Sequence, residues 1–183
     1  MRKDPKAQWL TSGSTRTGNY AALRCQPVTL VVRLLTIELR KYMNFTEELQ
    51  NLNYIAVVIA TITSYVLGFV WYHWAVFGEA WANALGLTKE EADKTEGLGG
   101  AFAISLVSGL TKTIFIALLM SATNISGVIS GAFFGAVLAI VFTATSLGYY
   151  NGFARTPSKL TLINSAHSVI ELALIGAIIG VFT

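Results

Sequence analysis

The chain has 183 residues, of which 54% are hydrophobic and 13% charged, and its mean hydropathy is +0.58. This composition is too apolar for an ordinary soluble domain and predicts one membrane domain. The formal charge of +3 does not indicate a nucleic-acid partner, because from Met43 onward five basic and eight acidic residues leave a net charge of −3. A single cysteine, Cys25, excludes an internal disulfide and a cysteine metal cluster, and no cofactor motif is present.

Residues 1–42 form a basic prefix, in which residues 1–26 mix Ser, Thr, Gly, Arg and Lys without apolar periodicity, a composition that predicts disorder. Three interpretations stay open: an arm in the cytosol or on the membrane surface, a basic targeting peptide, or upstream sequence ahead of a native start at Met43. The acidic lead-in that begins at Met43 favours the third. The remaining domain is then 43–183.

Four apolar runs follow, at about 52–74, 98–122, 124–150 and 160–182, and each is long enough to cross a bilayer as a helix. They predict an all-α, integral membrane four-helix bundle, multi-pass and in contact with lipid. The very short turn between the second and third runs predicts that these two helices form an antiparallel hairpin.

The segment between the first two runs predicts a short interfacial helical loop. Phe77 and Trp81 lie at helical spacing and favour a helix along the membrane surface, which Gly86 can end. Thr88 and Glu91 match the spacing of a capping box and predict a second short helix through residue 94.

Two repeated features indicate how the helices sit and pack. Amphipathic rings at the end of the first run and in the loop predict an aromatic belt at the membrane interface: Trp71, Tyr72, Trp74 and Trp81. Small residues recur every four positions and predict close helix approach: Ala56, Ala60, Ser64 and Gly68; Gly127, Gly131 and Gly135; Gly176 and Gly180. Several such stripes on one thin bundle predict a homo-oligomer.

The last run carries Asn164, His167 and Glu171, and offsets of three and seven residues place them on one helical face. A carboxylate inside a membrane helix normally faces a partner or a cavity. Lys112 in the second run lies at a similar depth, so we expect Lys112 and Glu171 to pair. Together the four residues form the candidate intramembrane polar site, and His167 is expected to lie inside the bundle.

Several stretches together resemble the bacterial four-helix membrane family catalogued as domain of unknown function 1761: 67–72, 77–81, 84–88, Pro157 and 162–167. The resemblance covers about 53–182 and implies a membrane fold in the bacterial plasma membrane but no established activity. The chain departs from the family pattern at His73-Trp74, where a Gly-Pro pair is usual, and Glu171 is an addition. A role of Glu171 therefore need not extend to relatives.

Two functions from different classes fit these residues. The first is a small transporter or channel-like protein that passes a small solute or a proton through the polar site, since His can change charge near neutral pH. The alternative is a structural or accessory membrane protein in which the same residues lock the helices together. No nucleophile with a base and no metal set is apparent, so we expect no enzyme. Water access to the polar site separates the two functions.

Overall fold

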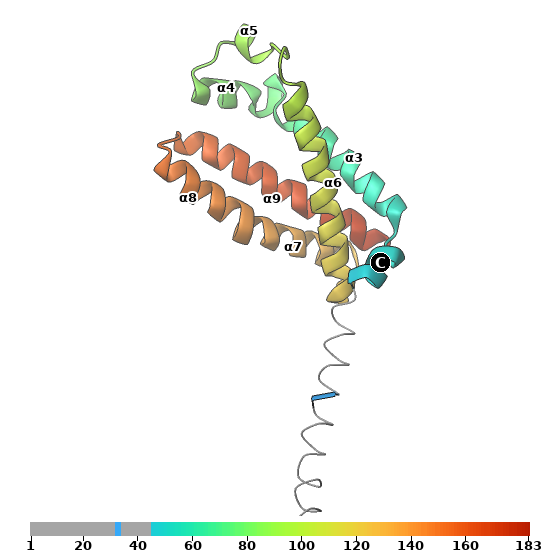
Figure 1. Ribbon diagram of the computed structural model, residues 1–183. Coiled ribbons are helices and arrows are strands. Elements are labelled where there is room, and N and C mark those ends of the chain that lie inside the picture. The colour runs from blue at the N-terminus through green and yellow to red at the C-terminus, as the bar shows by residue number, and fades with distance from the viewer. Residues whose placement is uncertain (1–31, 34–44) are drawn as a thin grey trace, which may run out of the picture. The chain divides into compact units, whose positions relative to one another are not determined.

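The computed structural model describes residues 32–33 and 45–183. The predictions made for the prefix fall, but for residues 32 and 33, outside this part of the chain. The unit Phe45–Thr183 is all-α (Figure 1). Its helices, in chain order, are α2 (Phe45–Asn51), α3 (Tyr54–Trp71), the π-helical turn η2 (Trp74–Gly78), α4 (Glu79–Leu85), α5 (Lys89–Ala92), α6 (Gly99–Ala122), α7 (Val128–Leu138), the π-helical stretch η3 (Ala139–Ala144), α8 (Thr145–Phe153) and α9 (Ser158–Val181).

Within the described residues, four helices are long and apolar enough to cross a membrane: Tyr54–Trp71, Gly99–Ala122, Val128–Phe153 and Ser158–Val181. The third of them is continuous through α7, η3 and α8. The predicted four-helix membrane bundle is therefore confirmed, and the second and fourth spans begin and end within two residues of their expected positions.

The ends of the first span differ from the prediction because of specific caps. The side chain of Asn53 accepts a hydrogen bond from the backbone N–H of Ala56 at 3.2 Å, which starts α3 at Tyr54. At the other end, His73 adopts an extended conformation (φ −65°, ψ 144°), so the helix stops at Trp71. The expected span of 52–74 is thus too long at both ends.

The third span begins and ends later in the sequence than the predicted range of 124–150. It begins at Val128 because Asn124 (φ 55°) and Gly127 (φ 86°) lie in the left-handed region and interrupt the helix. It continues to Phe153 because Asn151 stays helical, and its side-chain amide donates to Thr161 Oγ1 at 3.0 Å. The loop expected from residue 151 to 159 is reduced to 154–157.

The connector between α3 and α6, residues 72–98, contains the short helices that the sequence predicts. Gly86 (φ 74°) ends α4 in the left-handed conformation. The backbone N–H of Glu91 donates to Thr88 Oγ1, and the backbone N–H of Thr88 donates to Glu91 Oε2, which completes the capping box of α5. The helix α5 ends at Ala92, two residues before the expected end.

The helix α9 is the centre of the bundle. It runs alongside α7 and α8 (Figure 1) and also packs against α3 and α6. The expected hairpin of the second and third helices is therefore wrong, because α7 packs along α9 and not along α6. The largest fully buried side chains are Met120, Ile175 and Thr113.

The glycines explain why α7 prefers α9. A Cβ on Gly131 would collide with the carbonyl oxygen of Gly176, and one on Gly135 would collide with that of Leu172. At the same interface the backbone N–H of Gly127 donates to the carbonyl of Gly180 at 3.0 Å. The two glycine stripes thus pack against each other within one chain, since only glycine lets two backbones approach so closely.

Candidate functional site

The polar residues of α9 meet the lysine of α6 inside the bundle. Lys112 Nζ lies 2.5 Å from Glu171 Oε1, which confirms the predicted pair. The Glu171 side chain is 6% exposed and the Lys112 side chain 34% exposed. The carboxylate is thus enclosed by protein, whereas the ammonium group keeps an open side.

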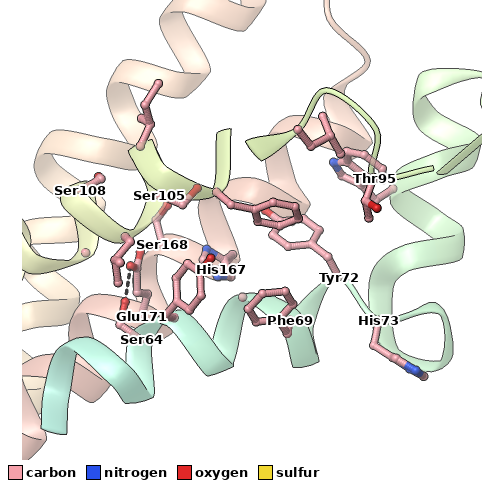
Figure 2. Close-up of a pocket in the computed structure, with 18 of the residues that line it drawn as sticks. Ser64, Phe69, Tyr72, His73, Thr95, Ser105, Ser108, His167, Ser168 and Glu171 are labelled. Carbon is pink, nitrogen blue, oxygen red and sulfur yellow. Dashed lines mark hydrogen bonds between the residues drawn. The ribbon is translucent and has the colours of Figure 1, made fainter. Parts of the chain in front are cut away.

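A third helix reaches the same carboxylate oxygen. Ser64 Oγ donates a hydrogen bond to Glu171 Oε1 at 2.6 Å, as Figure 2 shows. Ser64 is buried and belongs to the small-residue stripe of α3 that includes Ala56 and Ala60. The small-residue pattern predicted only a packing role for Ser64. Its hydroxyl, the sole polar group in that stripe, was the available signal.

His167 lies one helical turn before Glu171 and inside the bundle, as predicted. Its ring centre is 5.8 Å from that of Trp71 and 5.3 Å from that of Tyr72. The Nε2 atom is buried without a hydrogen-bond partner, and a Cβ on Gly68 would stand 3.9 Å from it. A methyl group at position 68 would be in ordinary van der Waals contact with the imidazole, so His167 lies against this part of α3.

Asn164 is connected to the site through an aromatic residue. Tyr72 donates its hydroxyl to Asn164 Oδ1 at 2.9 Å. Burial, and secondarily the negative charge of Glu171, raises the pKa of Tyr72 to about 12, so this hydroxyl stays a donor at neutral pH. Asn164 therefore holds Tyr72 in place beside His167 and has no direct hydrogen bond to Lys112 or Glu171 among the described residues.

The rings of the predicted aromatic belt contact one another and other side chains of the connector. Trp71 differs from the expectation for a ring among lipid headgroups, because it is only 8% exposed and its ring centre lies 4.4 Å from that of Phe77. Tyr72 and Trp81 are in edge contact at 5.9 Å. Lys89 Nζ lies 5.5 Å above the ring of Trp74.

A cleft of about 1060 Å³ lies between α3, α6, α9 and the connector. One end holds the polar site residues Ser64, Lys112, His167 and Glu171, and the other lies near His73 and Thr95 (Figure 2). Its volume reaches the upper range of small-molecule sites. Asn164 is not part of its lining.

Serines and aromatic rings complete the cleft wall. Ser105 and Ser108 of α6 and Ser168 of α9 line it. Phe69 and Phe102 stack at 6.0 Å with an interplanar angle of 20° and supply an apolar side. The cleft thus combines the Lys112–Glu171 pair, several hydroxyl groups and an aromatic wall, and His73, Lys89 and Asp93 line its other end. In the described residues, no group of three or more His, Cys, Asp or Glu side chains comes together as a metal site would require.

The comparisons with known proteins address the family. The family model described as a protein of unknown function (DUF1761) matches residues 55–180. The chain belongs to this family. No curated protein and no solved structure matches the chain.

Membership in DUF1761 confirms the resemblance found in the sequence. The matched region contains the cleft-lining helices and all four residues of the polar site. The family description carries no activity, so the function of this DUF1761 member has to be argued from its site.

Proposed function

We propose that the protein binds a small polar or charged solute in the cleft and carries it across the membrane, as a small transporter. The cleft that borders the polar site is the observation that supports this proposal best. A purely structural ion pair needs no open volume beside it. Here, however, about a third of the Lys112 side chain is exposed and Lys112 lines the cleft. An ammonium group at this depth needs water or a ligand rather than lipid.

A structural role is the second candidate, and one arrangement favours it. Glu171 Oε1 joins three helices by accepting from Ser64 and pairing with Lys112. Such a lock would serve an accessory membrane protein in which the cleft is filled by lipid. Water inside the cleft distinguishes the transporter from the lock, since a lock functions when dry.

Cysteine accessibility in native membranes tests for this water. In a Cys25→Ser background, Ser108→Cys and Ser168→Cys each place a thiol on the cleft wall near the middle of a span. The control Val141→Cys places one at a similar depth in the third span, at an exposed position outside the cleft. A charged, membrane-impermeant thiol reagent requires water and a thiolate to react.

The transporter proposal expects both cleft thiols to react at least about tenfold faster than the thiol at position 141, which faces lipid, where thiolates do not form. Equal and negligible rates at all three positions would contradict it and favour the lock. Reaction at position 141 as fast as in the cleft would also contradict it, because water would then not be confined to the site.

We also propose where the protein is located, what chemistry it lacks and how it assembles. The protein is a multi-pass membrane protein with four helices able to span the bilayer; we place it in the bacterial plasma membrane and treat it as non-enzymatic. Self-association into a homo-oligomer stays a proposal. The contact between two copies would have to use other surfaces, because the glycine stripes that contain Gly131 and Gly176 already pack against each other within one chain.

A further inference from the structure

The polar end of the cleft presents a cation rather than an anion. Lys112 is 34% exposed there, whereas Glu171 is 6% exposed. Both polar contacts of Glu171, from Lys112 and from Ser64, go to Oε1. An ammonium group has three donors, and within the described residues Glu171 is the one hydrogen-bond partner of Lys112. Lys112 can therefore donate to a ligand in the cleft.

The charges near this point balance. Four groups face Glu171. They are Lys112 of α6, Ser64 of α3, Tyr72 directly after the end of α3, and His167 of α9 itself. The helix α7, on the other side of α9, contains no titratable residue, and Glu79 of α4 is exposed and outside the cleft lining. One cation and one carboxylate thus form a neutral pair between two membrane spans.

A neutral pair restricts what can bind. An anion that approached Lys112 would leave two negative charges and one positive charge in a poorly hydrated place, which is costly. Neutrality is restored if Glu171 takes up one proton. An organic ammonium ion is disfavoured, because it would meet Lys112 before it met the enclosed carboxylate.

The aromatic wall indicates the rest of the ligand. The Phe69 and Phe102 rings lie on the cleft, and the ring centre of Tyr65 is 5.1 Å from that of Phe69 in edge contact. These rings offer an apolar surface for a hydrocarbon or aromatic body. The polar end and this aromatic wall together fit a small molecule with one anionic group and an apolar part.

We propose that the cleft binds a small organic anion of the monocarboxylate class at Lys112, together with one proton that is taken up by Glu171. This inference rests on the proposed transporter function and names its substrate class. The anion and one proton from water enter together. The ligand carboxylate replaces Glu171 as the partner of Lys112, and the proton forms an O–H bond on Glu171 Oε2. Net charge is unchanged, so transport of the pair is electroneutral.

Benzoate is a suitable probe, because it combines a carboxylate with a ring. Calorimetric titration of the purified full chain, in two buffers with different ionisation enthalpies, counts the protons bound with each benzoate. About one proton per benzoate is expected, and where Glu171 is ionised the affinity should fall about tenfold per pH unit as the pH rises. Benzylammonium, with the same ring and opposite charge, should not bind.

Variants assign the two roles. Glu171→Gln should bind benzoate without proton uptake and with an affinity that does not change with pH. Lys112→Met should lose binding at least about tenfold, as expected for a charge-assisted contact. The double variant Lys112→Met/Glu171→Leu, which restores neutrality, should also not bind. Lys94→Met and Glu79→Gln, at exposed positions outside the cleft lining, are matched controls that should bind like the wild type.

The possible results test the anion class, the role of Glu171 and the transporter function separately. Benzylammonium binding without benzoate binding would overturn the anion class, as would benzoate binding that survives in the double variant. Benzoate binding without proton uptake would overturn the role of Glu171. If benzoate does not bind but the thiols at positions 108 and 168 react with the charged reagent, the substrate class fails while the proposed transporter function stands. If those thiols are also unreactive, both fail.

Discussion

Removal of Lys112 should destabilise the protein more than removal of Glu171, although the two residues form one pair. Lys112→Met leaves a carboxylate that is 6% exposed with Ser64 as its remaining partner. An uncompensated buried charge costs roughly 3 to 5 kcal/mol. Because the Lys112 side chain is a third exposed, the pair is not fully enclosed, and we expect about 3 kcal/mol, the lower end of that range.

The reverse substitution is milder for two structural reasons. In Glu171→Leu, the exposed side of Lys112 lets its ammonium group turn into the cleft on its flexible stem. Ser64 loses its acceptor but can donate to the carbonyl one turn earlier, as Thr61 does to Val57 at 2.8 Å. A loss of about 1 to 2 kcal/mol is therefore expected.

The double variant Lys112→Met/Glu171→Leu measures the coupling. Because it leaves no isolated charge, its loss should fall short of the sum of the two single losses by about 2 kcal/mol. The assay is equilibrium unfolding by denaturing detergent in mild micelles, followed by circular dichroism. Lys94→Met and Glu79→Leu, at exposed sites, are the controls and should lie near the wild type. Additive single effects, or a larger loss for Glu171→Leu than for Lys112→Met, would refute this reasoning.

Two further predictions concern the scaffold. Gly135→Ala forces α7 away from the carbonyl of Leu172 and should lower the thermal unfolding midpoint by several degrees, whereas Gly148→Ala, where nothing lies within 4 Å, should leave it unchanged or raise it; equal effects would show that the α7–α9 contact is looser than described. Thr88→Ala removes the side-chain hydrogen bond that helps to hold the pKa of Glu91 below its usual range but keeps the backbone N–H of residue 88, which is the larger cause, so NMR titration should find that pKa raised only in part. A lowered pKa stabilises the fold above the unfolded value, so the part of the stability difference that comes from the Glu91 charge should disappear as the pH falls through the folded pKa of Glu91, while the part from the lost hydrogen bond of the Glu91 N–H to Thr88 Oγ1 should persist in acid. A stability difference that does not change with pH would refute the role of the Glu91 charge.

The sequence was sufficient where one local signal acts alone. Span length and apolarity identified four membrane helices, and Gly86 together with the capping box of Thr88 and Glu91 predicted the connector helices. It was also sufficient for Lys112 and Glu171, because two opposite charges at similar depths in apolar helices have few alternatives to pairing.

Only the tertiary structure decided which helix packs on which. Every helix offered small residues, so periodicity could not reveal that the stripe of Gly131 and Gly135 packs on α9 rather than outside the chain. The same holds for Ser64, whose hydroxyl meets Glu171 through a contact between residues 107 positions apart. The cleft has the same origin, because its walls come from three helices and a connector whose relative placement depends on long-range packing and not on local sequence.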